Sequence, residues 1–422
     1  MDDIALISAR LPNGRIADIS ILNGLITHIG CANSADVKVD CQNQLCIPAA
    51  IDVHVHMRDG SQSSKEDWTT GSQSAVAGGV ATVIDQPNTV PPIETVSDFK
   101  SRVDMARKSS LCHYGINGSA TKTSDISGLV NAGAFAFGEM FTAPSSYGYP
   151  LDINEISSVL TDINSYGSIT TIHAELIKQM GVNNLSEHSL SRSVDGEADI
   201  ITKINKTAPL NAKLHYCHMS GAQSIKCALS RNNTSCEVTP HHLFLSYDQL
   251  SNQSDTLFKI NPPIRTKQDQ LKIWEIYDQI PIIASDHAPH TCFDKSLPFI
   301  DAPSGVPGVE TMMPLLMNAV FQGKISLQSI ITKTVTNPYS VFGYIPPSIS
   351  VGSRADLAVY SNEPVVIHAD NLHSKCGWSP YEGLPGVFPM TTIVGGSIVW
   401  HNNEFITPLR PPIWFNGKHY IV

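Results

Sequence analysis

The sequence predicts an α/β fold in which a central (β/α)8 barrel, or TIM barrel, is joined to a small β-sandwich built from both chain ends. The first observation is an alternation of strand-like and helix-like segments across residues 50–344. The second is a set of short apolar runs at both ends of the chain, separated by turns such as Asn23-Gly24. Because the two ends of a domain commonly lie close together, we expect 1–49 and 345–422 to form one composite sandwich.

Eight segments between the two ends have the length and the Val, Ile and Thr content of strands. Candidate helices lie between them, and the one at 267–279 has an apolar face. Eight βα units in succession are typical of a (β/α)8 barrel, in which polar functional side chains gather at the carboxyl ends of the strands. The predicted strands are 51–58, 80–86, 111–117, 134–141, 168–175, 213–219, 235–239 and 281–287, and the predicted helices are 97–109, 152–164, 197–207, 221–230 and 267–279.

Composition excludes several classes of protein. The net charge of −10 argues against general nucleic-acid binding. No apolar run reaches the roughly 18–20 residues of a membrane-spanning helix, and the acidic start Met1-Asp2-Asp3 is unlike a secretory signal. The nine cysteines are scattered without a Cys-x-x-Cys pair, which favours reduced thiols. We therefore expect a cytoplasmic protein that binds neither nucleic acid nor membranes.

The first predicted strand carries the motif Asp52-Val53-His54-Val55-His56-Met57-Arg58. Alternate side chains of a strand share a face, so His54, His56 and Arg58 point the same way. Alone, this motif fits hydrogen-bonded histidines in a half-buried strand as well as it fits a metal site. Polar residues at the ends of the other strands favour the metal site, and they include Asn88, Glu139, His173, His218, Asp286 and His290.

These residues suffice for two divalent metal ions. His54, His56 and Asp286 would hold one ion, and His173 and His218 the other, with a bridging group between them. Imidazole and carboxylate ligands without thiolate suit zinc, with manganese, cobalt or iron as alternatives. Two such ions bind and acidify a bridging water, and the resulting hydroxide attacks an sp² carbon. Asp286 would take the proton and return it to the leaving nitrogen, which predicts hydrolysis, or its reverse, of an amide or imide C–N bond.

The motifs together resemble those of dihydroorotases, cyclic-amidohydrolase-type members of the metal-dependent amidohydrolase superfamily, from about residue 48 to Gly396. The resemblance implies the reversible cyclisation of N-carbamoyl-L-aspartate to dihydroorotate in pyrimidine synthesis. It also implies that Arg58, Asn88 and His290 bind a substrate carboxylate and that Asn261 contacts the substrate ring; an arginine suits the carboxylate because it can bind it bidentately. The motifs are Asp52–Arg58, Gln86–Thr89, His173–Glu175, His218–Ser220, Glu237–Leu243, Asn261–Arg265 and Ser285–His290.

One position departs from the resembled pattern. Many members of the superfamily bridge the metals with a carboxylated lysine after the fourth strand, but Gly138 stands there and no lysine occurs between Lys122 and Lys178. Glu139 is our candidate for the bridge. The alternatives are that Glu139 binds one metal only, or that it supports a histidine ligand.

Four residues close to the predicted site have structural interpretations as well. Cys217 is expected to be a packing residue inside a strand, and His241 and His242 are expected to be structural. Glu175 would either orient His173 or be a solvated charge at the rim. The segment 301–308 is rich in turn formers, and it would either bring backbone groups to the ligand or form a plain surface loop.

Two other functions stay open. A hydantoinase or allantoinase would have the same fold and chemistry, but Arg58 with Asn88 favours a substrate that carries a carboxylate. A catalytically silent relative would act as a scaffold, for instance for aspartate transcarbamoylase, but such proteins usually lose their ligands. A homodimer and an association with aspartate transcarbamoylase are the macromolecular partners left open.

Overall fold

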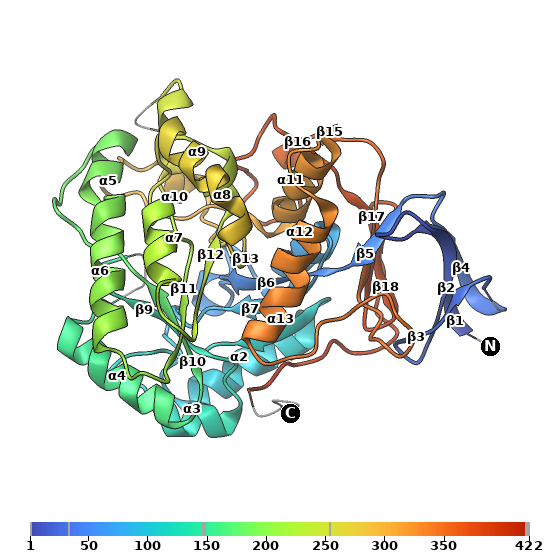
Figure 1. Cartoon of the computed structure of the whole chain (residues 1–422), viewed down its shortest axis with the longest axis horizontal. Helices are drawn as coiled ribbons and strands as arrows, with labels where there is room; N and C mark the ends of the chain where they lie inside the picture. Colours follow the sequence, from blue (N-terminus) through green and yellow to red (C-terminus); the bar gives the residue numbers. More distant parts are fainter. Residues whose placement is uncertain (1, 33, 146–148, 253–254, 418–422) are drawn as a thin grey trace.

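The computed structural model describes residues 2–32, 34–145, 149–252 and 255–417, and it confirms the predicted fold class. Figure 1 shows the barrel with its surrounding helices on the left and a twisted sheet made from both chain ends on the right. In this part of the chain the eight barrel strands are β6 (Ala50–Val55), β7 (Val80–Asp85), β8 (His113–Ile116), β9 (Phe137–Phe141), β10 (Ile169–His173), β11 (Lys213–Tyr216), β12 (Thr234–Val238) and β13 (Ile282–Ile283).

The barrel strands pair in parallel in the order of the sequence. β6, β7 and β8 form one run and β9 to β13 another. Isolated parallel bridges between Gly118 and Phe137 and between Val55 and His287 join the two runs into a ring. Each predicted strand is present; seven are shorter than predicted, β12 has the predicted length but begins one residue earlier, and the eighth has two residues instead of seven. It ends early because the chain turns sharply there, with Asp286 at a φ of 48°.

Helices follow the strands on the outside of the barrel. The predicted helices correspond to α2 (Val96–Ser109), α4 (Ile153–Ser165), α6 (Val194–Thr207), α7 (Ala222–Ala228) and α9 (Lys267–Glu275). α2 begins one residue before the predicted Ser97, because Thr95 and Asp98 form a capping box. Helices that were not predicted are α1 (Trp68–Ala77), α3 (Ile126–Ala132), α5 (Leu185–Ser191), α8 (Pro240–Phe244), α10 (Cys292–Ser296), α11 (Val309–Phe321), α12 (Leu327–Ile331) and α13 (Asn337–Val341), with the π-helical η5 (Thr332–Thr336) between the last two.

The longest helix that was not predicted is α11, and its burial explains why. Residues 309–319 of α11 are all buried, and they include Met312, Met313, Leu316 and Met317. A helix that is buried on every side lacks the regular alternation of polar and apolar residues by which a surface helix is recognised. The short helices α8, α10 and α13 have too few turns to show a period.

Both chain ends contribute to one sheet, in the order β19-β18-β17-β14-β5-β1-β2-β3, with β4 also paired to β1. β5 pairs antiparallel with β14, and this contact joins the two ends. Ile4, Leu6 and Ile19 pack with Leu357 and Ile393 in the core of this sheet. The strands are β1 (Asp2–Arg10), β2 (Ile16–Leu22), β3 (Leu25–Gly30), β4 (Ala35–Asp40), β5 (Leu45–Pro48), β14 (Leu357–Tyr360), β17 (Pro389–Val394), β18 (Ser397–His401) and β19 (Glu404–Phe405).

Parts of the C-terminal segment lie against the barrel. Trp378 donates its indole N–H to the backbone oxygen of His290 at 2.7 Å, near the carboxyl ends of the strands. Phe415 donates its backbone N–H to the oxygen of Tyr114 at the other end. The division of the chain at residues 49 and 345 stays a prediction, and residues 418–422 lie outside the described residues.

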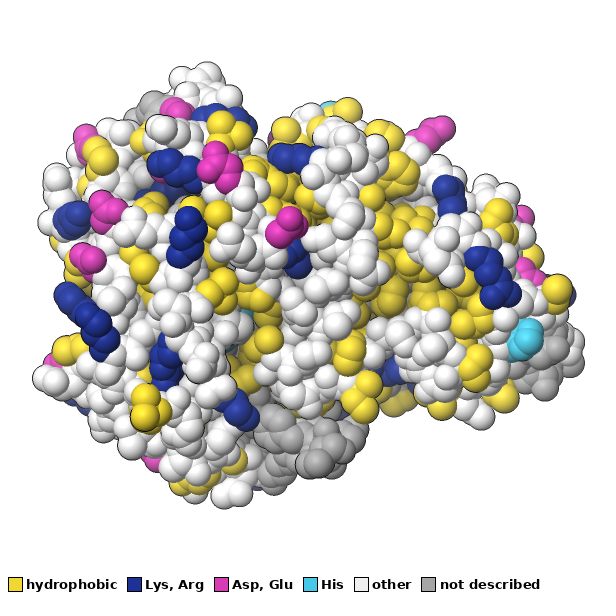
Figure 2. All heavy atoms as spheres, in the orientation of Figure 1, with side chains coloured by type: hydrophobic (Ala, Val, Ile, Leu, Met, Phe, Trp, Pro, Cys, Tyr) yellow, Lys and Arg dark blue, Asp and Glu magenta, His cyan; other side chains and the backbone are white. Residues whose placement is uncertain are grey.

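The surface in Figure 2 shows basic and acidic side chains interspersed over the barrel helices, with apolar side chains gathered between the barrel and the sheet. Among the helices of the described ranges, none has both the length and the apolar character needed to cross a membrane.

Candidate metal centre

Glu139, in strand β9, lies between two pairs of histidines at the carboxyl ends of the strands. Its Oε2 lies 3.5 Å from His54 Nε2 and 3.7 Å from His56 Nε2. Its Oε1 lies 3.1 Å from His173 Nδ1 and 3.0 Å from His218 Nε2. Each carboxylate oxygen therefore faces one pair of imidazoles, the arrangement that a bridging ligand needs.

Asp286 joins the first of these pairs. Its Oδ1 lies 3.3 Å from His56 Nε2 and 3.5 Å from His54 Nε2. The carboxylate lies beyond the end of β13, and the positive φ of Asp286 accompanies the turn of the chain there. The structure thus brings together all six residues predicted as metal ligands.

The distances between these side chains fit a metal ion. Two donor atoms each about 2.1 Å from one tetrahedral ion lie about 3.4 Å apart. The separations among His54, His56, Glu139 and Asp286 are 3.3–3.7 Å. His54 Nε2 is buried and has no hydrogen-bond partner among the described residues, so its lone pair is available to a cation. The donor set therefore fits a divalent cation, and the sharing of Glu139 fits two of them.

In two of these histidines, the ring nitrogen that points away from the centre is hydrogen-bonded to a carboxylate. His54 donates its Nδ1–H to Glu237 Oε1 at 2.5 Å, and His173 donates its Nε2–H to Glu175 Oε2 at 2.6 Å. Each contact leaves the other ring nitrogen facing the centre, as is usual for metal-bound histidine. Glu175 thus orients His173, and Arg192 forms an ion pair with the same carboxylate.

Glu237 is a residue that sequence reasoning left without a role. Besides His54, it accepts a hydrogen bond from His215 Nε2 at 2.9 Å and one from the backbone N–H of His218 at 3.3 Å. Burial alone would raise the pKa of Glu237, but His54 and His215 lower it to about 2. The sequence signals were its position at the end of a predicted strand and its place in the motif Glu237–Leu243, and neither assigned it a role.

The centre is rich in negative charge. Burial opposes ionisation of Glu139, but His54, His173 and His218 outweigh it and hold the pKa of Glu139 well below its usual value. Burial also opposes a charge on His54, yet Glu237, Glu139 and Asp286 raise the pKa of His54 well above its usual value. Since the buried carboxylates stay ionised and attract positive charge, the site favours a cation.

Cys217 lies closer to the centre than its predicted packing role suggests. Its sulfur belongs to a third group of potential ligand atoms with His54 and Glu237. Burial raises the pKa of the Cys217 thiol to about 12. His242 is structural as predicted, with Nε2 3.3 Å from the backbone oxygens of Pro262 and Pro263.

The residues predicted to bind substrate surround the same cavity. Arg58, Asn88 and Asn261 line it together with His56, Glu139 and Asp286. His290 contacts one of these lining residues, since its Nε2 lies 3.4 Å from Arg58 Nη2. The structure therefore places cationic and amide side chains beside the candidate metal ligands.

The loop at 299–306 forms part of the cavity wall, since Ser304 and Gly305 line it. Lys259 donates its ammonium hydrogens to the backbone oxygens of Phe299 and Ala302. Lys295 donates to the backbone oxygen of Pro303 at 3.0 Å. The segment is therefore held from beneath by two lysines and is not a plain surface loop.

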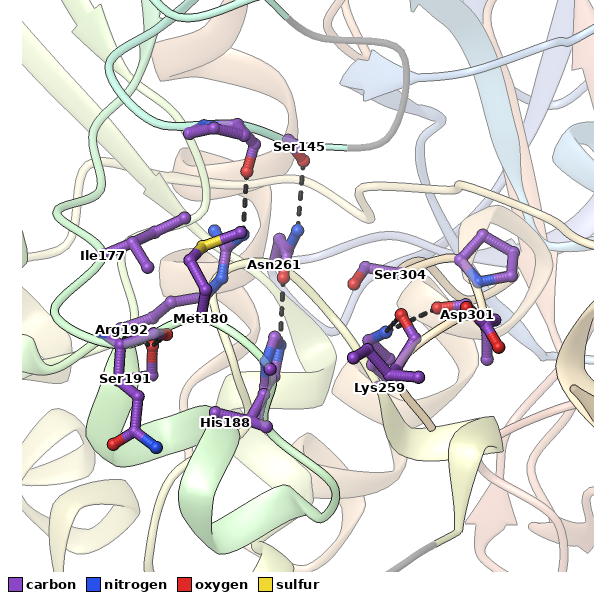
Figure 3. A pocket seen from close by; sticks show the side chains of 17 residues that line it. Ser145, Ile177, Met180, His188, Ser191, Arg192, Lys259, Asn261, Asp301 and Ser304 are labelled. Carbon is purple, nitrogen blue, oxygen red and sulfur yellow. Dashed lines mark hydrogen bonds between the residues drawn. The ribbon is translucent and has the colours of Figure 1, made fainter. Parts of the chain in front are cut away.

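A wider outer cavity adjoins the inner one, and Ser145, Asn261 and Ser304 line both. Figure 3 shows Asn261 between His188 and Ser145 in this outer cavity. His188 Nε2–H donates to Asn261 Oδ1 at 3.0 Å, and Asn261 Nδ2 donates to Ser145 Oγ at 3.1 Å. The Asn261 amide thus has a defined orientation at the junction of the two cavities.

Solved structures that superpose on this chain are titled hydantoinases or dihydropyrimidinases. L-hydantoinase (dihydropyrimidinase) from Arthrobacter aurescens superposes with a TM-score of 0.89 at 24% identity, covering 99% of this chain and 100% of that one. D-hydantoinase from a Thermus species superposes with a TM-score of 0.88 at 21% identity, covering 99% and 100%. At these identities the likeness concerns the fold.

The barrel fold and the similarity to dihydroorotases define the class: this protein is a barrel hydrolase that acts on cyclic amide C–N bonds. A family model described as Dihydro-orotase-like matches residues 43–149. The dihydroorotase of Methanosarcina acetivorans is 38% identical, covering 92% of this chain and 89% of that protein. The dihydroorotase of Halobacterium salinarum is 36% identical, covering 93% and 95%. The chain belongs to the dihydroorotase family.

Proposed function

We propose that this protein catalyses the reversible cyclisation of N-carbamoyl-L-aspartate to (S)-dihydroorotate, a step of pyrimidine synthesis. The names of the relatives support this reaction. The observation that carries it is the position of Glu139 between two histidine pairs, beside a wall that contains Arg58. The guanidinium of Arg58 would bind the substrate carboxylate, and the histidine pairs would hold the metal ions that the reaction needs.

His54, His56 and Asp286 would hold one divalent ion and His173 and His218 the other, with Glu139 shared between them. Zinc is the ion that these imidazole and carboxylate donors favour. When bound, such a pair of ions would polarise the substrate carbonyl and lower the pKa of water. Glu237 and Glu175 would keep His54 and His173 in the tautomers that this role requires.

Asp286 is the residue that we assign to proton transfer. In the direction of hydrolysis its carboxylate would accept the proton of the attacking water and return it to the departing ring nitrogen. Burial opposes ionisation of Asp286, but His54 and His56 outweigh it and hold its pKa well below the usual value. The carboxylate is therefore ionised at neutral pH, which is the form that has room for a proton.

Arg58, Asn88 and His290 would bind the substrate carboxylate, and Asn261 would contact the ring at the junction of the two cavities. Arg58 donates its Nε–H to the backbone oxygen of Pro289, which orients the guanidinium. A planar guanidinium can form two parallel hydrogen bonds with a carboxylate. This favours dihydroorotate over hydantoin or allantoin, whose rings carry no carboxylate.

Steady-state assays against dihydroorotate, hydantoin and allantoin, with metal analysis of the same sample, test the proposal. We expect about two zinc ions per chain, a number that follows from two three-ligand groups, and turnover of dihydroorotate well above that of the other substrates. Preferred turnover of hydantoin or allantoin would reassign the substrate. Neither metal nor turnover would favour a scaffold.

Other features stay predictions. They are the cytoplasmic location, a homodimer, and an association with aspartate transcarbamoylase.

A further inference from the structure

We infer that Lys65 is a positioning residue for carboxylate recognition, because it fixes His290 in the tautomer that presents an N–H group beside Arg58. This inference rests on the proposed function. It adds a residue that belongs neither to the metal ligands nor to the residues assigned to substrate contact.

Lys65 lies between the short helix η1 (Gly60–Gln62) and α1, far in the sequence from the histidine that it contacts. Its Nζ lies 3.1 Å from His290 Nδ1 and 3.2 Å from Asp294 Oδ2. Its side chain is largely shielded, with 14% exposed. A lysine ammonium can donate hydrogen bonds but cannot accept them. His290 Nδ1 must therefore be the acceptor, and its proton must be on Nε2.

The other side of the ring requires the same tautomer. His290 Nε2 lies 3.0 Å from the backbone oxygen of Ser304, which can only accept a hydrogen bond. Arg58 Nη2, which can only donate, lies 3.4 Å from the same nitrogen, so with the proton on Nε2 it is a neighbouring donor and not a hydrogen-bond partner of His290. The Nε2–H group is thus held at the edge of the inner cavity, since both Ser304 and Arg58 line that cavity.

The charges around His290 favour an anionic ligand. Burial lowers the pKa of His290 well below its usual value, and the cations Arg58, Lys295 and Lys65 lower it further. His290 is therefore a neutral donor among positive charges, with Asp294 offsetting part of the charge of Lys65. The Arg58 guanidinium suits a carboxylate, and the His290 N–H group beside it could be shared between the backbone oxygen of Ser304 and the second carboxylate oxygen.

A purely structural role for Lys65 makes a different prediction. In that case the ion pair with Asp294, in the first turn of α10, would be the contact that matters. Asp294→Asn removes the ion pair and leaves the contact between Lys65 and His290. This variant is therefore the matched control.

The experiment compares Lys65→Met, Lys65→Gln, Lys65→Arg and Asp294→Asn in the metal-loaded full-length enzyme. It measures kcat and KM for dihydroorotate and the inhibition constant of dihydrouracil, the same ring without the carboxylate. We expect Lys65→Met and Lys65→Gln to raise KM by about 10- to 100-fold, the range for a misplaced hydrogen bond to a charged group. The kcat should change less, the dihydrouracil constant should stay within about two-fold, and Lys65→Arg should restore much of the affinity because arginine also donates only.

Three results would overturn the inference. One is an unchanged KM in Lys65→Met and Lys65→Gln. Another is an equal loss of affinity for dihydroorotate and dihydrouracil, and the third is an Asp294→Asn variant with the same defect as Lys65→Met.

Melting temperature and metal content, measured on each variant, separate misfolding from these outcomes, and Lys65→Gln replaces Lys65→Met if the latter does not fold. Absence of dihydroorotate turnover in the wild-type enzyme would instead overturn the proposed function, and the inference with it.

Discussion

Two clusters of buried polar side chains lie at opposite ends of the barrel, and they differ in how completely their atoms are hydrogen-bonded. The cluster at the carboxyl ends of the strands centres on Glu139. The cluster at the amino ends centres on Asp356, which accepts a hydrogen bond from His113 at 3.1 Å and from the backbone N–H of Gly395 at 2.7 Å. Arg354 forms an ion pair with the other oxygen of Asp356.

The polar atoms at the centre of the Asp356 cluster have hydrogen-bond partners among the described residues. Arg354 donates to the Tyr339 hydroxyl at 3.0 Å, which lies 2.7 Å from Thr82 Oγ1. His113 Nδ1 accepts the backbone N–H of Ile413. In the Glu139 cluster, by contrast, acids converge on imidazole nitrogens, and His54 Nε2 has no partner among the described residues. Burial alone therefore does not mark a functional site, whereas convergence of acceptors without matching donors does.

Asp286→Asn should have the largest effect. The amide keeps the shape of the side chain but loses the carboxylate that accepts a proton, so we expect kcat for dihydroorotate to fall by about a thousand-fold or more. Melting temperature should fall only as far as metal content falls, because Asp286 is also a proposed metal ligand. The exposed Asp104→Asn is the control. A nearly normal rate in Asp286→Asn would remove this residue as the proton carrier.

Glu139→Gln should weaken metal binding, because a neutral amide is a poorer bridge than a carboxylate. We expect metal affinity to fall by about a hundred-fold or more, judged by the ten- to hundred-fold losses seen when only supporting residues are changed. Removal of metal by a chelator should lower the melting temperature of the wild-type enzyme, since a ligand bound to the folded state stabilises it. Metal analysis and calorimetry measure both effects, with Glu404→Gln on β19 as control. Full metal content in Glu139→Gln would favour a merely supporting role for Glu139.

Asp356→Asn should destabilise the fold by about 3–5 kcal/mol, the usual result of breaking a buried ion pair. Burial opposes ionisation of Asp356, but His113 and Arg354 hold its pKa below the usual value. A carboxylate with a lowered pKa stabilises the folded state above its unfolded pKa of about 3.9 and loses this effect as pH falls.

The difference in melting temperature between wild type and Asp356→Asn should therefore be large at neutral pH and shrink below about pH 4. KM for dihydroorotate should not change, and Asp36→Asn on the exposed strand β4 should behave as wild type in both measurements. A large rise in KM in Asp356→Asn, together with an unchanged melting temperature, would show that the Asp356 cluster serves substrate binding and not stability.

Arg58→Ala should have the smallest effect, confined to substrate affinity. Loss of a charge-assisted contact should raise KM for dihydroorotate by about 10- to 100-fold, with a smaller change in kcat. The exposed Arg107→Ala, which removes a surface ion pair with Asp104 away from the cavity, is the control. An unchanged KM in Arg58→Ala would show that the substrate carboxylate binds elsewhere.

The sequence by itself determined the order of the barrel strands and the residues at their ends. Alternation along one strand is a local property, so it predicted that His54 and His56 share a face; β6 ends at Val55 and Arg58 has a φ of 51°, so the position of Arg58 depends on the turn of the chain there. The strand ends and the family motifs pointed to His173, His218 and Asp286, and Glu139 was the candidate where the chain departs from the family pattern; the structure brings these residues together. Helices with a polar and an apolar side could also be predicted, whereas the buried α11 could not.

Only the tertiary structure decided which distant residues support the candidate metal ligands and the substrate-binding residues. Glu237 is separated from His54 by 183 positions and Lys65 from His290 by 225, and no periodic pattern relates residues so far apart. Their contacts arise because closing the barrel brings all the strand ends to one rim. The same closure separates the Glu139 cluster from the Asp356 cluster at the other end, although both are built from the same kinds of side chain.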